Sequence, residues 1–222
     1  MKSIGLTIEV PVASFRMPYA REYAESYEIP PPATVYGMLL ALVGEQDRYR
    51  HVGARIAIAR PDKYPEPARS VVLRTFRRIK HKPVSDPRNA RPDFQEILTG
   101  LYLTVWVDAD ADLEAKPTLA ERLTSALNDA QSIERFGGLS LGESRDLVDS
   151  VSLLTDNEGE DNGSNSVGQP CQWLKRDDVG PLTMPYWVDH VGSSKTRWAS
   201  YRLVSGSIGD PDAECWTAIS PS

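Results

Sequence analysis

Residues 101–130, LYLTVWVDADADLEAKPTLAERLTSALNDA, contain the pattern that decides the fold. Apolar and polar side chains alternate from Leu101 to Val107, which predicts a half-buried β-strand. An acidic turn follows, and Thr118 with Glu121 forms a capping box that opens a helix. Leucines and alanines then recur on one stripe of that helix, so it should pack on the sheet that contains the strand.

The same kind of strand and helix occurs earlier in the chain. Residues 4–10 alternate as a strand, a helix capped by Thr34 should end at Gly44, and a second strand is predicted at residues 54–59. A last strand is predicted at residues 146–154. This order of elements is typical of the ferredoxin-like α+β fold, the fold of RNA-recognition-motif-like domains.

Residues 70–99 interrupt this order and predict an inserted β-hairpin. The arms are VVLRTFRRIKHK (71–82) and FQEIL (94–98), with the tip between them. We therefore expect a main domain at residues 1–154, with the hairpin at about 70–99. The acidic, Gly/Ser/Asn-rich residues 155–168 predict a flexible loop. Residues 169–222 should form a small β-rich segment that packs on the main domain.

Charge is distributed unevenly along the chain. The net charge of −6 argues against a protein that coats nucleic acid generally. Residues 69–91, however, contain eight Arg or Lys and one Asp, a net charge of +7, so the rest of the chain carries −13. A basic patch on an acidic body indicates a polyanion bound at one place.

The basic residues of the hairpin are the first candidates for RNA contacts. Arginines on a hairpin can reach phosphates and stack on unpaired bases, and Phe76 and Phe94 could wedge against bases. The alternative is a solvated hairpin whose charges only prevent edge-to-edge aggregation. The candidate contacts are Arg74, Arg77, Arg78, Lys80 and Lys82.

A glycine-rich run, RFGGLSLGES at residues 135–144, is the second candidate site. Glycines let the backbone approach a ligand, and the neighbouring Ser and Arg side chains can donate to phosphate oxygens. The run lacks the Lys of a P-loop and the spacing of a dinucleotide fold, so no nucleoside triphosphate site is predicted. A tight turn without a ligand explains the glycines equally well. The candidate residues are Gly137, Gly138, Ser140, Gly142, Ser144 and Arg145.

An irregular stretch dense in Arg, Tyr and Pro precedes the first predicted helix and is the third candidate site. The positive end of a helix beside arginines and tyrosines suits a phosphate and a stacked base. The alternative is that the tyrosines cover the seam between helix and sheet. The candidate contacts are Arg16, Tyr19, Arg21 and Tyr27.

No catalytic set is evident in the sequence. His51, His81 and His190 are scattered and have no metal-ligand spacing with the two cysteines, and no nucleophile motif is present. We therefore expect no catalytic residue, metal or cofactor. The alternative is a metal-independent ribonuclease that uses His81 with Lys80 or Lys82 as acid and base.

The sequence also predicts where the protein resides. The longest uncharged apolar stretch, residues 37–44, is eight residues long and too short to span a membrane. Glu9 interrupts any signal-peptide core near the N-terminus. We expect a cytoplasmic protein whose Cys171 and Cys215 are reduced structural thiols.

Three long motifs, together with the basic hairpin, resemble one family. The chain is similar to the CRISPR-associated Cas-five subunits, with the best match to the DevS-type branch of type I systems, over most of its length. The motifs are FRMPYAREYAESYEIPPPATVYGMLLALVGE (15–45), RFGGLSLGESRDLVD (135–149) and PYWVDHVGSSKTRWASYRL (185–203).

The resemblance implies a RAMP-type protein that caps the 5′ handle of the CRISPR guide RNA inside Cascade, in antiviral defence. The hairpin at Ser70 to Thr99 would be its thumb, and the loop from Gly137 to Arg145 would hold the handle. The implied partners are the backbone subunit (Cas-seven family), the large subunit (Cas-eight family) and, through the complex, target DNA.

Some relatives in type I-C systems process precursor RNA with a Tyr, Lys and His set. This sequence has no residue-by-residue match to that set, so a non-catalytic subunit is expected. The rival hypothesis is a metal-independent endoribonuclease that acts on CRISPR repeat RNA. A third is a protein-interaction module whose basic hairpin meets an acidic partner.

Overall fold

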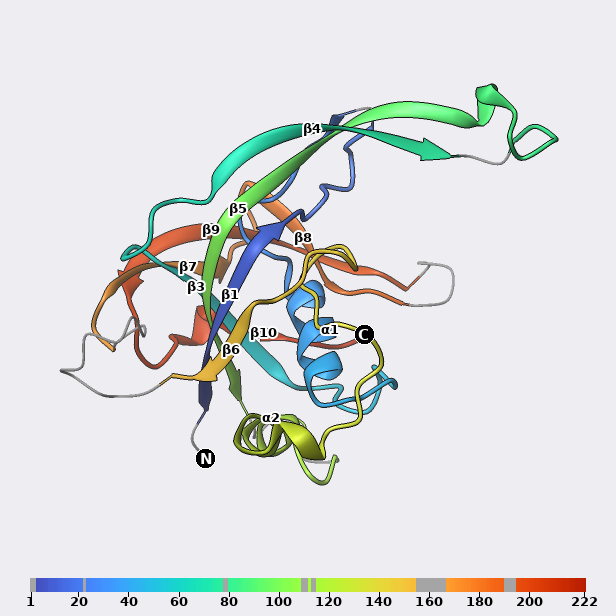
Figure 1. Cartoon of the computed structure of the whole chain (residues 1–222). Helices are drawn as coiled ribbons and strands as arrows, with labels where there is room; N and C mark the ends of the chain where they lie inside the picture. The colour runs from blue at the N-terminus through green and yellow to red at the C-terminus, as the bar shows by residue number, and fades with distance from the viewer. Residues whose placement is uncertain are drawn as a thin grey trace.

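A computed structural model describes residues 3–21, 23–77, 80–108, 112, 115–154, 167–189 and 195–222, apart from the side chains of residues 75–77 and 91. The described strands form one large sheet (Figure 1). It is antiparallel except where β2 runs parallel to β5. In chain order the elements are β1 (Ile4–Ala13), β2 (Tyr23–Ala24), α1 (Pro32–Leu42), β3 (Arg55–Pro61), β4 (Ala68–Arg77), η1 (Pro87–Asn89), β5 (Ala90–Asp108), α2 (Leu119–Asn128), η2 (Ala130–Ser132), β6 (Ser150–Leu153), β7 (Pro170–Arg176), β8 (Leu182–Trp187), β9 (Arg197–Ser207), η3 (Ala213–Cys215) and β10 (Thr217–Ala218).

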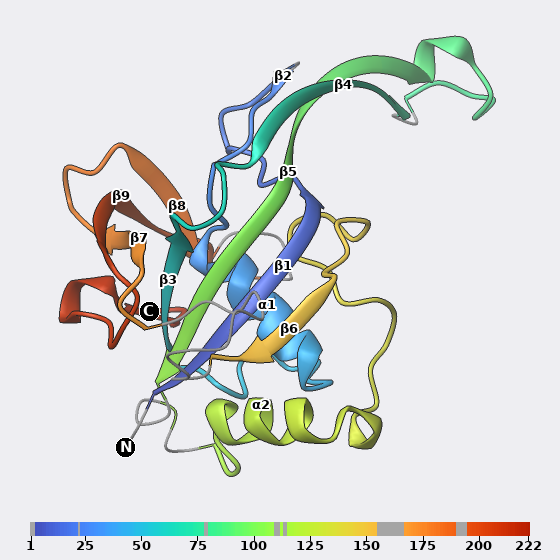
Figure 2. The same ribbon diagram turned by 60° about the vertical axis from the view of Figure 1, so that its left-hand side comes forward.

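The order of strands in the sheet is β6-β1-β5-β3-β7-β9-β8. The first four strands of that order are the strands of the predicted main domain, and α1 lies against one face of them (Figure 2). The C-terminal strands extend the same sheet, because β7 pairs with β3 and β10 also pairs with β3. The fold is therefore α+β, with two α-helices among the described residues and one large sheet. None of the described helices is long and apolar enough to cross a membrane.

The predicted capping box is confirmed at the start of α2. The Thr118 hydroxyl accepts a hydrogen bond from the Glu121 amide, and the Glu121 carboxylate accepts one from the Thr118 amide. These two bonds satisfy amides that the helix itself leaves without partners, which fixes where α2 begins.

The start of α1 differs from the prediction. The helix begins at Pro32, and Thr34 lies inside its first turn instead of capping it. Proline is tolerated at this position because its missing N–H would have had no partner in the first turn. The end of the helix is as predicted: Gly44 follows it with φ of +68°, a conformation that glycine adopts without strain.

The last predicted strand and the return arm of the hairpin also need correction. β6 covers only Ser150–Leu153, and residues 146–149 belong to the preceding loop. The return arm and the strand at residues 101–107 are one strand, β5, of 19 residues. Gly100 lies within this strand with φ of +76°, a conformation that glycine adopts without strain, and Leu98 and Leu101 on either side of it are both buried. Residues 155–166 of the predicted acidic loop lie outside the described part of the chain.

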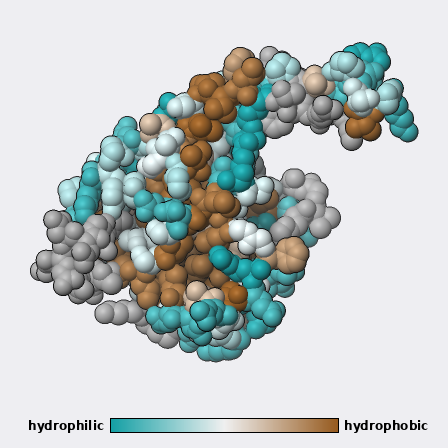
Figure 3. All heavy atoms as spheres, viewed as in Figure 1, coloured by the Kyte–Doolittle hydropathy of each residue, from teal (hydrophilic) through white to brown (hydrophobic). Residues whose placement is uncertain are grey.

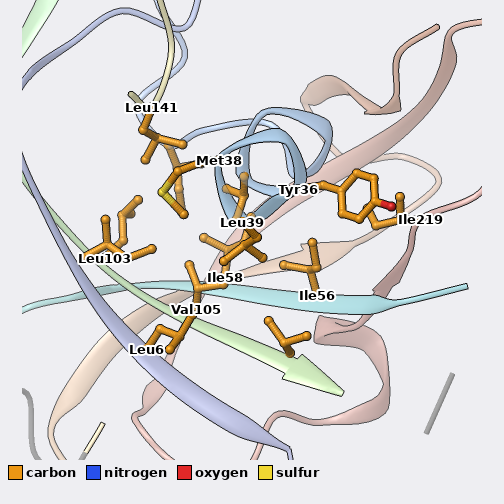
Figure 4. Packing of buried hydrophobic residues seen from close by; sticks show 14 of the residues in the cluster. Leu6, Tyr36, Met38, Leu39, Ile56, Ile58, Leu103, Val105, Leu141 and Ile219 are labelled. Carbon is orange, nitrogen blue, oxygen red and sulfur yellow. The ribbon is translucent and has the colours of Figure 1, made fainter. Parts of the chain in front are cut away.

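The main core lies between the sheet and α1. Leu103 and Val105 of β5 and Ile58 of β3 face Met38 and Leu39 of the helix (Figure 4). Each fully buried aliphatic side chain of this kind stabilises the fold by about 1.5–3 kcal/mol. The apolar face of β5 that its alternation predicts thus lies in the main core.

A second, smaller cluster covers the opposite face of the sheet. Trp106 of β5 and Trp173 of β7 pack with their ring centroids 4.6 Å apart. Cys171 and Cys215 are buried in the same cluster as free thiols. Burial raises the pKa of the Cys171 thiol to about 12 and that of Cys215 to about 11, so both remain protonated at neutral pH.

Candidate nucleic-acid interface

β4 and β5 form the predicted hairpin and project beyond the body of the sheet (Figures 1 and 2). At its base, one face of the hairpin carries exposed apolar side chains. Val71 is 52% exposed, Leu73 is 65% exposed, and Phe94, paired with Leu73 across the two strands, is 51% exposed. Tyr23 of β2 pairs with Phe94 on the other side and is 40% exposed. Figure 3 shows an apolar band running from the hairpin onto the body, while the far end of the hairpin is mostly hydrophilic.

The far end of the hairpin is organised by one buried side chain, Asn89. Its carboxamide oxygen accepts hydrogen bonds from the Lys80 and His81 amides, both at 2.9 Å. Its amide group donates to the His81 carbonyl at 2.8 Å. Lys80 and Lys82 are exposed on this ordered tip. The tip therefore presents two lysines from a backbone that is held in place before any ligand binds.

The glycine-rich run forms a loop that is anchored to β1 by Asp146. This carboxylate is 5% exposed, and its Oδ2 accepts hydrogen bonds from the Ser14 amide at 3.0 Å and the Glu143 amide at 2.9 Å. Burial raises the pKa of Asp146, although the two amide hydrogen bonds and the nearby Arg74 oppose this effect. The loop closes on itself through the Leu141 amide, which donates to the Asp146 carbonyl at 2.9 Å.

The absence of a side chain at Gly142 is explained by close packing against other residues of the protein. Its φ is +114°, and a Cβ there would lie 2.8 Å from the Asp146 carboxylate and 2.9 Å from the Ser14 carbonyl. Protein atoms already fill the space on the Cβ side of Gly142, so the fold itself requires glycine here, and contact of RNA with its exposed backbone stays a prediction. Gly137 is exposed and a Cβ there would meet nothing within 4 Å, whereas at Gly138 it would lie 2.9 Å from Leu147.

The glycine loop meets the base of the hairpin through a polar cluster. Glu143 of the loop pairs with Arg74 of β4 at 3.0 Å and with Arg145 at 2.8 Å. Gln95 of β5 donates to Glu143 at 2.7 Å and accepts hydrogen bonds from both arginines. Arg74 is thus a partly buried member of this cluster instead of a free residue on the hairpin surface, whereas Arg145 is 47% exposed.

The N-terminal candidates divide into surface and core residues. Arg16, Tyr19 and Arg21 are exposed, and the Arg16 guanidinium donates to the Ala20 carbonyl at 2.8 Å. Tyr27 is only 2% exposed, and its hydroxyl donates to the Thr183 carbonyl. Burial raises the pKa of Tyr27 to about 12. The prediction that Tyr27 contacts RNA is corrected, because its side chain is buried in the main core.

The structure brings the three candidate regions to one end of the sheet. Glu96 of β5 accepts hydrogen bonds from the Ser26 amide at 2.8 Å through its carboxylate and from the Ser14 hydroxyl at 2.9 Å through its carbonyl. Ser14 in turn is held by Asp146 of the glycine loop. Of the remaining candidates, Ser140 is half-buried and Ser144 is exposed on the loop. Arg78 and the side chain of Arg77 lie outside the described residues, as does the side chain of Phe76.

Sequence reasoning missed Asp146, Gln95 and Glu143, which connect these regions, and Asn89, which organises the hairpin tip. The first three depend on partners far away in the chain, such as Asp146 with Ser14, and no local pattern marks such pairs. Glu143 is part of the quoted glycine run, but the sequence does not show that its carboxylate pairs with both Arg74 and Arg145.

The two histidines that the structure describes, His51 and His81, lie in separate parts of the fold. His51 is fully buried, with Nδ1 2.7 Å from the Asp112 carboxylate and Nε2 3.1 Å from the Arg122 guanidinium. His81 lies half-buried at the hairpin tip, and His190 lies outside the described part. Within the described ranges no group of three or more His, Cys, Asp or Glu could hold a metal ion.

Comparison with known proteins decides the family. A family model described as CRISPR-associated protein (Cas_Cas5) matches residues 3–157, more than half of the chain. The chain belongs to the Cas5 family. A Cas5 relative from Myxococcus xanthus (strain DK1622), named CRISPR-associated protein Cas5, is 41% identical over 202 residues, which are 90% of this chain and 89% of the relative. The family resemblance read from the motifs is confirmed.

Solved structures share the Cas5 fold of this chain. A chain from a structure titled CRISPR RNA-guided surveillance complex aligns over 96% of this chain and 95% of its own, with a TM-score of 0.62 and 14% identity. A second, titled Crystal structure of Cas protein, aligns over 93% and 94% with a TM-score of 0.52 and 14% identity. At such identities the likeness shows the fold alone.

Proposed function

We propose that this Cas5 protein is a non-catalytic subunit of a type I Cascade complex that binds the 5′ handle of the CRISPR guide RNA. The observation that carries the proposal is the meeting of three predicted RNA-binding regions at one end of the sheet, held together by Ser14, Glu96 and Asp146. Independent motifs that converge on one surface are better explained by a shared ligand than by three separate turns.

The chemistry of this surface supports single-stranded RNA as the ligand. Arg145 and Arg16 offer guanidinium donors that suit phosphates, and Lys80 and Lys82 extend the positive charge to the hairpin tip. The exposed ring of Phe94 beside Tyr23 offers a stacking surface for unpaired bases. In this proposal the β4–β5 hairpin is the thumb of the subunit.

The arrangement of the sheet supports the finer description of the fold and its partners. The strand order β6-β1-β5-β3 is the order expected for a ferredoxin-like domain in which an inserted hairpin follows the second strand, β3. We propose the backbone and large subunits as its protein partners. The exposed apolar residues Val71 and Leu73 suit a protein neighbour, because such patches usually mark interaction sites.

The tip lysines give the direct test of RNA binding. The double substitution Lys80→Ala and Lys82→Ala should weaken binding of handle RNA, because two phosphates lose their counter-charges. If both lysines touch phosphate, the slope of log affinity against log salt should flatten by about 1.4. The measurement is fluorescence anisotropy with labelled RNA across a salt series, on the assembled complex.

The matched control removes the same charge elsewhere. Lys63 and Lys116 are exposed and lie outside the proposed surface, so replacing both with Ala should leave the slope unchanged. Equal slopes for the tip variant and wild type, with both folded by circular dichroism, would show that the hairpin tip faces protein or solvent.

The absence of catalysis is a separate prediction. His81→Ala should leave the amount and length of mature guide RNA unchanged in cells that express the whole system, because the sequence contains no matching catalytic set. Northern blots of guide RNA would measure this. Loss of mature guide in the variant, with the complex still assembled, would favour the metal-independent endoribonuclease.

A further inference from the structure

Glu143 joins the glycine loop to the base of the hairpin within the proposed RNA surface. Its carboxylate is negatively charged, as is the RNA that this surface is proposed to bind. Its Oε2 lies 3.0 Å from Arg74 and 2.8 Å from Arg145, and its Oε1 accepts a hydrogen bond from Gln95 at 2.7 Å. Both oxygens of the carboxylate are therefore engaged by donors. Two of those donor groups are guanidiniums, and the more exposed of them, that of Arg145, is proposed to bind RNA.

A carboxylate and a phosphate offer a guanidinium the same feature: two negatively charged oxygens that accept parallel hydrogen bonds. The cluster is open to solvent, because the Glu143 side chain is 37% exposed and that of Arg145 is 47% exposed. The Glu143 backbone is held by its own bond to Asp146, so the side chain can rotate away while the loop stays in place.

We infer that Glu143 is an internal counter-ion whose place a phosphate of the guide RNA takes, and this inference rests on the proposed function. Before binding, Glu143 neutralises the charge of the two arginines with which it pairs. Any RNA must displace it, which weakens binding of every sequence by a similar amount. Only an RNA with further contacts along the loop and hairpin binds well despite this cost, so Glu143 sharpens selectivity for the handle.

Two other roles for Glu143 predict different effects when its charge is removed. If its main role is to orient the arginines for RNA, its neutralisation should weaken binding. If it is only a structural link between loop and hairpin, neutralisation should change stability and leave affinity alone. The exchange role alone predicts tighter binding when the charge is removed.

The experiment compares Glu143→Gln with Glu134→Gln in the full chain. Glu134 is exposed on the segment before the loop, so its substitution removes the same charge without touching the arginines. The probes are a labelled single-stranded RNA with the repeat-derived handle and a scrambled RNA of the same length. Glu143→Gln should bind the scrambled RNA about fivefold more tightly at low salt, the size expected for one exposed ion pair. Its preference for the handle should fall.

The gain should depend on the arginine that Glu143 releases. Adding Arg145→Ala to the Glu143→Gln variant should abolish the tighter binding. Unchanged or weaker binding by Glu143→Gln, or an equal gain in Glu134→Gln, would overturn the inference. The proposed function is tested separately by the wild type, which must prefer handle RNA to scrambled RNA. A wild type without that preference would refute the function, while the comparison of the two Gln variants would still decide the exchange.

Discussion

Gly142→Ala should lower the free energy of unfolding by about 2–4 kcal/mol, from the strain of the backbone and the crowding of the new Cβ. The backbone φ of +114° is one that side chains rarely adopt. The added carbon would also meet the Ser14 carbonyl at 2.9 Å, and Ser14 directly follows β1 and is held by Glu96 and Asp146, so it cannot move freely. Urea denaturation followed by tryptophan fluorescence measures the change.

Gly137→Ala is the matched control for this prediction. Gly137 has φ of +79° but open space around it, so its substitution adds conformational strain without a clash. The expected loss is about 1 kcal/mol. Equal losses at the two glycines would mean that the close packing of the loop on β1 contributes nothing to stability.

Asp146→Ala should be comparably destabilising, by about 2–4 kcal/mol, because it leaves two amides without their acceptor. The Ser14 and Glu143 amides both donate to the same buried carboxylate oxygen. The loop should also separate from β1, so RNA affinity should fall together with stability. Urea denaturation and RNA binding would be measured on the same preparations.

Asp146→Asn separates the hydrogen bonds from the charge. Its side-chain carbonyl can accept from both amides, so this variant should be at least as stable as wild type at neutral pH. The pKa of Asp146 is raised in the folded protein, mainly by burial. The stability that this raised pKa contributes to the folded protein is therefore fully present below the unfolded pKa of about 3.9. It is lost as pH rises through the folded pKa.

The stability of wild type relative to Asp146→Asn should accordingly fall as pH rises from about 4 toward neutral. Unfolding free energies of the two proteins across that range give the test. A wild type that gains stability over the Asn variant with rising pH would show that Arg74 and the amides outweigh burial.

The sequence was sufficient for the elements whose signals are local. The alternation in LYLTVWV and the pair Thr118 and Glu121 predicted β5 and the start of α2, because strand faces and helix caps depend on neighbours within a few residues. It failed at Thr34, where prolines just before it already start the helix, and at Gly100, which joins two predicted segments into one strand.

The candidate site was predictable only in part. Composition located the basic hairpin, and the motifs placed the chain in the Cas5 family. Whether an individual side chain faces solvent was decided by tertiary packing. Tyr27 and Arg16 belong to the same irregular stretch, yet one is in the core and the other is exposed.

By itself the sequence determined the order of strands and helices, the family and the concentration of positive charge at residues 69–91, since all three are written in local pattern and composition. Only the tertiary structure decided that Arg74 pairs with Glu143 and that Asp146 anchors the glycine loop to Ser14. These contacts join residues about 70 and 130 positions apart, and such pairs form when the sheet brings distant strands together. No spacing in the chain encodes them.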